Sequence, residues 1–401
     1  MELTVKDKFR IDALHAVMDG RLTMEKAAKV LQRSVRQAYR LLRRLRTQGI
    51  QGLIHKNRGR PSPRRIPEPV RQRILDLAQG RYQDINDTHL CELLGDREGV
   101  HISRESLRTI LRKEDIQSKR RRKAPKYRSR RPRREAFGAM LQIDASPHLW
   151  LEDRGPELTL VAAKDDATGH VWARFVQSEC TWAYLDLMTQ VFASHGLPLS
   201  LYSDRHTIFH SSREPTLQEQ LRGLTPLTQF GRAMHELGIT IIRAYSPQAK
   251  GRIERHWGFS QDRLVAELRL DNACNLAEAN RVLQCWLADT VNARFTVPPT
   301  LKRSVFRKPP RKDLLDRILC LKDTRTVAKD HTISFEGLTL QIPPSKKFRS
   351  IAGKKVHVLQ PADGSIRIFY RHIPAAAFSP QAVDRLVQTK LIGPTNLKTA
   401  A

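Results

Sequence analysis

The spacing of apolar residues divides the chain into three stretches of different character. Up to about residue 117, apolar positions recur every three or four residues, which is the repeat of helices buried on one side. Between residues 136 and 295 short apolar runs alternate with helical repeats, and from 319 to 375 apolar and polar residues alternate singly, as in half-buried strands. The pattern predicts a multidomain α/β protein with helical units first, a mixed α/β domain in the middle and a small β-barrel near the end.

Residues 1–55 are expected to form a helix-turn-helix. An apolar stripe that includes Met18 stops at Gly20, Thr23 is placed to cap a short second helix and Ser34 to cap a third. The third helix has a predicted buried stripe made of Val35, Ala38, Tyr39, Leu42 and Leu45. Its outer face carries Arg36, Gln37, Arg40, Arg43 and Arg44. A recognition helix in a DNA major groove needs this distribution, so we expect these five residues to bind DNA. A solvated basic helix in a three-helix bundle is the alternative.

The next segments continue the DNA-binding pattern. A Pro-rich linker at 56–68 leads into a second helix-turn-helix-like unit at 69–117, which either reads DNA or is purely architectural. A basic linker follows at 118–135, where the 17 residues from Ser118 to Arg134 hold 11 Lys and Arg and no acidic residue. We expect its first part to follow DNA phosphates, through Lys119, Arg120, Arg121, Arg122 and Lys123.

The net charge of the chain supports the prediction that it binds DNA. The net charge is +30, and the first 134 residues supply +21 of it, with 36 Lys and Arg against 15 Asp and Glu. Such an excess favours a nucleic acid partner over a small metabolite. No apolar run approaches the roughly 20 residues of a membrane span, and the N-terminus lacks the apolar stretch of a signal peptide. The five cysteines form no metal-binding pattern and are expected to stay reduced, so we expect a soluble, cytoplasmic protein.

Three carboxylates in the middle domain are the candidates for chemistry. The strands predicted at 140–145 and 199–203 lead into Asp144 and Asp204 at their carboxyl ends, where ligands gather in mixed sheets. A loop of turn-forming residues from Ser246 to Gly251 then leads into a helix with Glu254 near its start. Three carboxylates brought together would hold two divalent ions, the arrangement used for in-line displacement at a phosphodiester.

Four motifs give the middle domain a family resemblance. They are the Gln142-Ile143-Asp144 strand end, the Asp165-to-Gly169 hairpin, the Tyr202-Ser203-Asp204 strand end and the Tyr245-to-Arg255 loop and helix. With them the chain resembles the retroviral-integrase superfamily, and most closely insertion-sequence transposases of the DDE type grouped as ISNCY. The resemblance implies a ribonuclease-H-like integrase catalytic core at 136–295. It also likens the β-barrel at 319–375 to the C-terminal barrel of Mu-type transposases, and leaves 376–401 as a tail without a motif.

The resemblance implies a function as well. The chain would be a DNA transposase that binds the terminal inverted repeats of a mobile element and catalyses 3′-end cleavage and strand transfer. Asp144, Asp204 and Glu254 would hold two Mg²⁺ or Mn²⁺ ions. Lys250, Arg252 and Arg255 flank Glu254 and are expected to bind the phosphates of the scissile strand or to hold the carboxylate, with a solvated basic helix start as the alternative. Its partners would be double-stranded DNA, as element ends and as target, and further copies of the chain in a homodimer or higher oligomer, associated with a prokaryotic nucleoid. A DNA-binding regulator derived from an inactive transposase is the alternative, and a junction or hybrid nuclease is disfavoured by the two helix-turn-helix units.

The remaining predictions concern neighbours of this site. Asp165 and Asp166 are expected to form hairpin hydrogen bonds rather than to bind metal. Trp257 is expected in the core, on the apolar side of its helix. Asp204 and Glu254 are 50 positions apart, against about 35 in the compact family members, so residues 211–226 are predicted to be a polar surface insertion.

Overall fold

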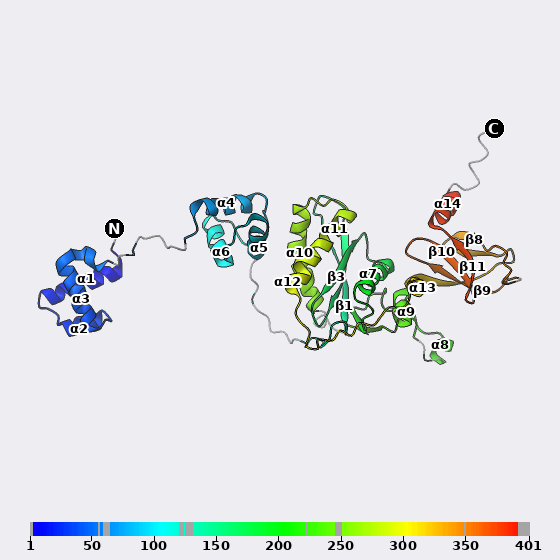
Figure 1. Ribbon diagram of the computed structural model, residues 1–401, viewed down its shortest axis with the longest axis horizontal. Helices are drawn as coiled ribbons and strands as arrows, with labels where there is room; N and C mark the ends of the chain where they lie inside the picture. Colours follow the sequence, from blue (N-terminus) through cyan, green and yellow to red (C-terminus); the bar gives the residue numbers. More distant parts are fainter. Residues whose placement is uncertain are drawn as a thin grey trace, which may run out of the picture. The chain divides into compact units, whose positions relative to one another are not determined.

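The computed structural model describes residues 3–54, 57–58, 65–119, 124, 131–221, 223, 225–244, 251–348 and 350–391. The chain divides into two compact units, Met1–Ile74 and Leu75–Ala401. The second unit holds both the mixed α/β core and the C-terminal strands (Figure 1).

The first unit is the predicted helix-turn-helix. Its elements are α1 (Val5–Met18), α2 (Met24–Val30), α3 (Val35–Gln48) and the 3-10 turn η1 (Gly49–Leu53). Thr23 and Ser34 cap α2 and α3 as predicted, by accepting the backbone N–H of Lys26 and of Gln37. The core of this unit is small and includes Ile11, Leu14, Ala28, Leu42 and Leu45.

Three side chains predicted to lie in this core are exposed. Met18 is 45% exposed, Val35 41% and Tyr39 57%. Only Ala38, Leu42 and Leu45 of α3 are buried, at positions i, i+4 and i+7, because a three-helix unit covers only a narrow stripe of its third helix. Val35 and Tyr39 therefore share the open face of α3 with its arginines.

A second helical segment follows in α4 (Glu68–Gln79), α5 (Asp87–Glu98) and α6 (Arg104–Lys113). Asn86 caps α5 and Ser103 caps α6. The helix α5 contacts the outer side of the long helix α10 (Gly251–Leu270) of the core through polar groups. His89 Nε2 lies 2.8 Å from Glu267 Oε1, and Arg263 of α10 pairs with Glu92. Paired charges rather than an apolar seam thus join the second helical segment to the core.

The middle domain is built on a five-stranded sheet with the order β3-β2-β1-β4-β5. Its strands are β1 (Leu141–His148), β2 (Leu158–Asp165), β3 (Val171–Val176), β4 (Ser200–Ser203) and β5 (Thr240–Arg243). The first three strands are antiparallel, and β4 and β5 run parallel to β1. This order and these directions are those of the predicted ribonuclease-H-like core.

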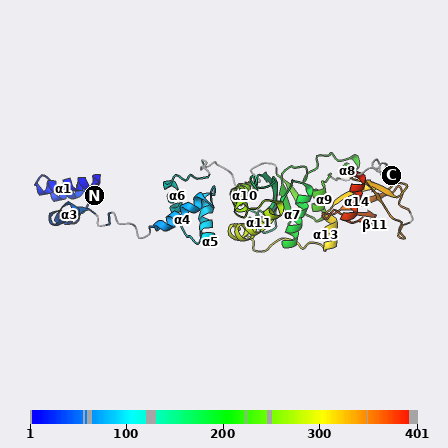
Figure 2. The same cartoon turned by 90° about the horizontal axis from the view of Figure 1, so that it is seen from above.

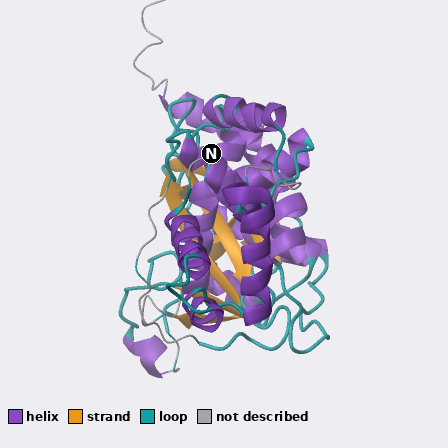
Figure 3. Cartoon of the chain, turned by 90° about the vertical axis from the view of Figure 1, so that its left-hand side faces the viewer, coloured by secondary structure: helices purple, strands orange, loops and turns teal. Residues whose placement is uncertain are grey.

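Helices cover both faces of this sheet, because alternate residues of its strands are apolar on each side (Figures 1 and 3). On one face Leu141 and Ile143 pack with α7 (Thr181–Ser194) and α9 (Gln229–Glu236). On the other face Leu160 and Phe175 pack with α10 and α11 (Leu276–Trp286). The sheet edge at β3 is closed by amide side chains: Asn280 bonds to the backbone N–H and C=O of Phe175, and Asn292 does the same for Val171.

The segment after α11 returns along the core. It continues through a π-helical stretch (Leu287–Asn292) and α12 (Ala293–Phe295), and then as an extended chain to α13 (Lys312–Ile318). In this extended part the backbone N–H of Val305 donates to the carbonyl of Phe137, and Arg307 and Leu197 exchange two backbone hydrogen bonds. The core domain thus includes a strap beyond residue 295, up to Ile318 and Leu319 in its apolar cluster.

The stretch predicted as an insertion lies on the surface. Its one helix among the described residues, α8 (Leu217–Leu221), has no buried residue, and Leu217 and Leu221 are 72% and 79% exposed. The ends of the stretch are tied together, because the Thr228 hydroxyl donates to the carbonyl of Ile208 at 2.6 Å and accepts from the N–H of Gly231. The insertion therefore leaves and rejoins the core at one closed point.

The C-terminal domain consists of strands, as predicted, with one helix beside them (Figure 2). A four-stranded antiparallel sheet has the order β11-β10-β9-β6, and β7 and β8 form a separate hairpin. The strands are β6 (Leu321–Thr326), β7 (Thr332–Phe335), β8 (Leu338–Gln341), β9 (Lys355–Gln360), β10 (Ile366–Tyr370) and β11 (Ile373–Phe378), followed by α14 (Pro380–Leu391). Both sheets contribute to one apolar cluster that includes Ile333, Leu340, Val356 and Ile368. The two sheets thus share one core.

Candidate active site

Asp144 and Asp204 lie on neighbouring parallel strands in matching register. Leu141 pairs with Leu201 and Gln142 with Tyr202, so the same register continued by two residues aligns Asp144 with Asp204. Both side chains are half-buried. The predicted placement of Asp144 at the end of its strand is wrong, because β1 runs on to His148 along β2. The pairing between β1 and β4 ends at Gln142 and Tyr202, so Asp144 lies two residues beyond the last paired residue of β1 on that side.

The helix α10 runs beside β1 and contacts Asp144 directly. The indole N–H of Trp257 donates to Asp144 Oδ2 at 2.9 Å. One turn earlier, the N–H of Ile253 donates to the side chain of Gln142, and one turn later Gln261 donates to Ser146. Trp257 is 8% exposed and lies in the apolar cluster, as predicted, but its hydrogen bond to Asp144 was not foreseen.

The negative charges of both aspartates affect the pKa of a buried tyrosine, Tyr184. The Tyr184 hydroxyl of α7 donates to Glu179 at 2.6 Å. Burial raises the pKa of Tyr184, and so do the hydrogen bond to Glu179 and the negative charges of Glu179, Asp144 and Asp204. Asp204 also accepts the backbone N–H of His206 at 3.0 Å, which fixes the turn after β4.

Glu254 lies in the first turn of α10, three residues before Trp257 and on the same side of the helix. Its side chain is exposed. Within the part of the chain that the structure describes, no three His, Cys, Asp or Glu side chains are gathered closely enough to hold a metal ion. Strand register therefore aligns Asp144 with Asp204, and Glu254 lies in the first turn of α10, the helix whose Trp257 bonds to Asp144.

The predicted hairpin of Asp165 and Asp166 forms, but the two carboxylates have different partners. Asp165 accepts the N–H and hydroxyl of Thr168, which are bonds of the turn itself, and the N–H of Gly138, which is 27 positions away. Asp166 accepts hydrogen bonds from Arg131, the N–H of Arg134, Gln142 and Arg252, all of them distant in sequence. Sequence reasoning missed this second set, because the pattern of a turn shows only local bonds.

A cluster of positively charged side chains lies near the start of α10. Lys164 of β2 faces α10 from the position paired with Gln142. Burial, as the larger cause, and the charges of Arg133, Arg255 and Arg252 together lower the pKa of Lys164 to about 8. The Arg133 guanidinium and the Lys164 side chain both lie within 4 Å of where a side chain on Gly169 would begin. Among the described residues only Arg252 of this cluster has an ion-pair partner, Asp166. We call Arg133, Lys164, Arg252 and Arg255 the cation cluster.

The other residues predicted to bind DNA are placed as follows. The side chains of Arg36, Gln37, Arg40, Arg43 and Arg44 are all exposed on α3. None of these arginines has an ion-pair partner within the described ranges. Lys119 is described and exposed, whereas Arg120, Arg121, Arg122, Lys123 and Lys250 lie outside the described residues.

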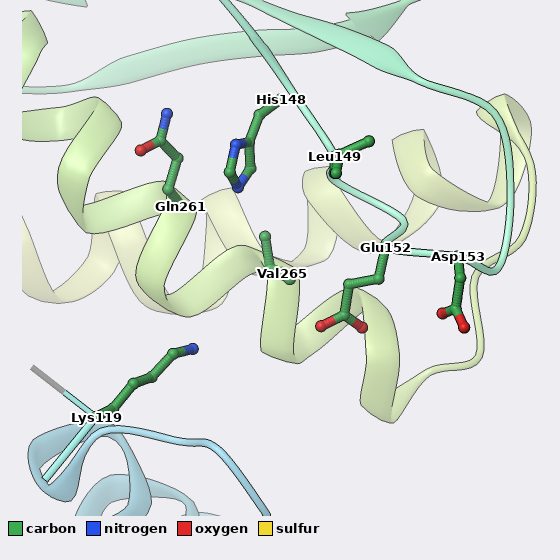
Figure 4. Close-up of a pocket in the computed structure, with 7 residues that line it drawn as sticks. All are labelled: Lys119, His148, Leu149, Glu152, Asp153, Gln261 and Val265. Atoms are coloured by element: carbon green, nitrogen blue, oxygen red, sulfur yellow. The ribbon is translucent and has the colours of Figure 1, made fainter.

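A cavity of about 640 Å³ lies beside Gln261 and Val265 of α10 (Figure 4). Its lining residues are Lys119, His148, Leu149, Glu152, Asp153, Gln261 and Val265. In Figure 4, His148 and Gln261 lie toward one end, Glu152 and Asp153 lie toward the other, and Lys119 faces them from a separate segment. Neither Asp144 nor Glu254 lines this cavity, so it is distinct from the candidate site.

Comparison with known proteins identifies the family. Residues 9–62 match the model of a helix-turn-helix domain, and residues 37–111 that of a homeodomain-like domain. A putative transposase of Sinorhizobium fredii (strain NBRC 101917 / NGR234), y4bF, is 36% identical over 374 residues, which cover 92% of this chain and 80% of that protein. The transposase for insertion sequence IS1202 of Streptococcus pneumoniae is 32% identical over 392 residues, covering 88% of this chain and 82% of the other. The chain belongs to the insertion-sequence transposases. It is a transposase with helix-turn-helix domains.

The transposase is also similar to solved integrase structures, though only distantly. The catalytic core domain of BIV integrase is 20% identical, with a TM-score of 0.28, and the match covers 41% of this chain and 91% of that one. The HTLV-2 integrase catalytic core domain in complex with magnesium is 17% identical, with a TM-score of 0.30, over 39% of this chain and 88% of the other. Such low scores carry no argument, so the assignment rests on the sequence relatives. Across the described residues, no helix of this transposase is long and apolar enough to cross a membrane.

Proposed function

We propose that this transposase cuts the ends of its own mobile element and joins them to target DNA, with Asp144, Asp204 and Glu254 as its catalytic carboxylates. The observation that carries the proposal is the shared register of Asp144 and Asp204 beside the first turns of α10, where Trp257 bonds to Asp144. The reaction would release a 3′-OH at the element end, and that hydroxyl would then attack a phosphodiester of the target.

The chemistry of the three carboxylates suits divalent ions. Carboxylate oxygens are the donors that Mg²⁺ and Mn²⁺ take, and the register that aligns Asp144 with Asp204 offers such donors from neighbouring segments. Glu254 is exposed, so its side chain is free of packing that would stop it from turning toward the pair. When bound, two Mg²⁺ or Mn²⁺ ions would supply charge stabilisation for the attacking and leaving oxygens. The protein's own part is to hold Asp144 by the indole of Trp257 and Asp204 by the turn at His206.

The DNA would follow two basic surfaces. The open face of α3 presents Arg36, Gln37 and Arg40 for the major groove, and exposed Tyr39 and Val35 add apolar contacts for thymine methyl groups. Near the active site, the cation cluster has four positive groups and, among the described residues, one carboxylate partner. A phosphate of the DNA backbone would neutralise part of this excess positive charge. We infer that the α3 face reads the terminal repeats and that the cation cluster holds the strand to be cut.

The reaction joins two element ends to one target, so we propose that at least two copies of the chain act together on DNA. A dimer or larger assembly on DNA in the nucleoid is the form in which both ends are held at once.

Amide variants test the catalytic assignment. Asp144→Asn, Asp204→Asn and Glu254→Gln should each lose at least about a hundredfold in the cleavage of labelled end DNA in Mg²⁺, because a neutral amide does not hold a dication. Binding to the same DNA, measured by fluorescence anisotropy, should change less than about threefold. If Asp204→Asn cleaves at the wild-type rate, the carboxylate assignment is wrong. If the wild-type protein binds end DNA but cuts none with Mg²⁺ or Mn²⁺, the chain is a DNA-binding regulator instead.

A further inference from the structure

Asp166 joins two parts of the chain that are far apart in sequence. Its carboxylate is 1% exposed and accepts hydrogen bonds from both sides of the core surface. On one side are the guanidinium of Arg131 and the N–H of Arg134 at 2.8 Å, at the end of the basic linker. On the other side are Gln142 of β1, at 2.9 Å, and Arg252 of α10. Arg252 also donates to the carbonyl of Arg131 at 2.7 Å, which closes the arrangement into a ring.

Gln142 links Asp166 to the backbone of α10 through hydrogen bonds. Its amide N–H₂ donates to Asp166, and its amide oxygen accepts the N–H of Ile253 at 3.2 Å. The first N–H groups of a helix have no partner within the helix, so an acceptor at this place fixes where the helix starts. Arg252 and Ile253 are thus both held through Asp166, and the next residue is Glu254.

We propose that Asp166 is a positioning residue that sets Glu254 for metal binding, with Gln142 as its relay, and that it ties the end of the basic linker to the same point. The inference rests on the proposed role of Glu254. Asp166 itself touches neither substrate nor metal, and it acts by holding Arg252 and the N–H of Ile253. Because Gln142 stands two residues before Asp144, the same bonds also hold the start of α10 at a fixed position along β1.

The neighbouring residue offers a matched control. Asp165 is also buried, at 0% exposed, in the same hairpin, but it bonds only to Gly138 and Thr168. Loss of the Asp165 carboxylate disturbs the hairpin without touching α10, whereas loss of the Asp166 carboxylate releases the start of α10. Asp165→Asn and Asp166→Asn therefore separate a structural effect from a positioning effect.

The test compares both variants in the full-length protein by thermal unfolding, end-DNA affinity, single-turnover cleavage and the Mg²⁺ concentration that gives half the maximal rate. For Asp166→Asn we expect cleavage to fall about 10- to 100-fold in low Mg²⁺, because a ligand displaced by about 1 Å is a poor one. The Mg²⁺ requirement should rise several-fold, high Mg²⁺ should restore much of the rate, and DNA affinity should stay within about threefold. Asp165→Asn should lower the unfolding temperature and leave the Mg²⁺ requirement unchanged.

A second variant keeps the test decisive if Asp166→Asn does not fold. Gln142→Met removes the bond to Ile253 and leaves the pairing of Asp166 with Arg131 and Arg252, and it should raise the Mg²⁺ requirement in the same direction. The inference is overturned if the variants lower thermal stability with no change in Mg²⁺ requirement. Glu254→Gln separates a failure of this inference from a failure of the proposed function. If Glu254→Gln is inactive while Asp166→Asn behaves as wild type, only the positioning role of Asp166 is wrong. If Glu254→Gln is fully active, the proposed catalytic role of Glu254 is wrong as well.

Discussion

The buried positive charge of Lys164 destabilises the fold. Replacing Lys164 should therefore make the protein more stable, and should also weaken its binding to DNA. An ordinary lysine has a pKa of 10.5, so a pKa of about 8 corresponds to at most about 3 kcal/mol of unfavourable free energy for its charged form in the fold. Lys164→Met keeps the aliphatic stem and removes the charge that Arg133, Arg252 and Arg255 repel. We therefore expect the free energy of unfolding at pH 7 to rise by about 1 to 3 kcal/mol, a gain of several degrees in Tm.

The dependence on pH gives a second measure of the same effect. In the unfolded chain Lys164 keeps its proton up to a pH near 10.5, whereas in the folded protein it releases the proton near pH 8. Between these values the unfolded state binds more protons, so folding stability gains as the pH rises. The advantage of Lys164→Met over the wild type should thus be full below about pH 8 and shrink toward pH 10.5.

The assays are urea unfolding at pH 7 and pH 9.5, and the affinity for end DNA as a function of salt. If Lys164 contacts a phosphate, the variant should bind more weakly, and the slope of log K against log salt should fall by about 0.9. Lys164→Arg, which keeps the charge, is the control and should gain no stability. A Lys164→Met protein that is less stable than the wild type at pH 7 would refute the reasoning, because the cations would then not be crowded enough to repel one another.

Two further predictions follow from the exposed parts of the chain. Arg36→Ala and Gln37→Ala should reduce the preference for the element's own ends over random DNA by about 1 kcal/mol or more each in competition binding, and equal losses on both DNAs would remove α3 from sequence reading. Replacing residues 212–223 with a short Gly/Ser linker should shift Tm by no more than a few degrees, because α8 buries no residue, yet impair strand transfer more than end binding; a large drop in Tm would show that the segment packs into the core.

Much of the core could be predicted because its strands are short apolar runs. The strand predicted at 199–203 is observed as β4, and Asp204 follows it as expected. The extension of β1 past residue 145 was missed because Ser146 and Pro147 do not look like strand residues. Beyond Asp144 the strand has no partner on the β4 side, and a proline is tolerated on such an edge.

The contacts that organise the candidate site could not be read from the sequence. Asp166 bonds to Gln142 and Arg252, which stand 24 and 86 positions away, and local patterns say nothing of such pairs. Trp257 was correctly placed in the core from its apolar stripe, but a stripe does not show where an indole N–H finds an acceptor. On α3, Tyr39 was assigned to the core by its type, although a small helical unit lacks the surface to cover it.

The hydrogen bond between Thr228 and Ile208 bears on how this family varies over evolution. It closes the base of the insertion just after Asp204, so chain added or removed between these two residues leaves the core strands and both ends of the loop where they are. The entropy cost of a longer loop grows only slowly with its length. The number of residues between the second and third carboxylates is therefore a weakly constrained trait that lineages can lengthen or shorten. The alignment of β1 with β4, by contrast, admits no change, since a slip of one residue would turn Asp144 to the opposite face of the sheet.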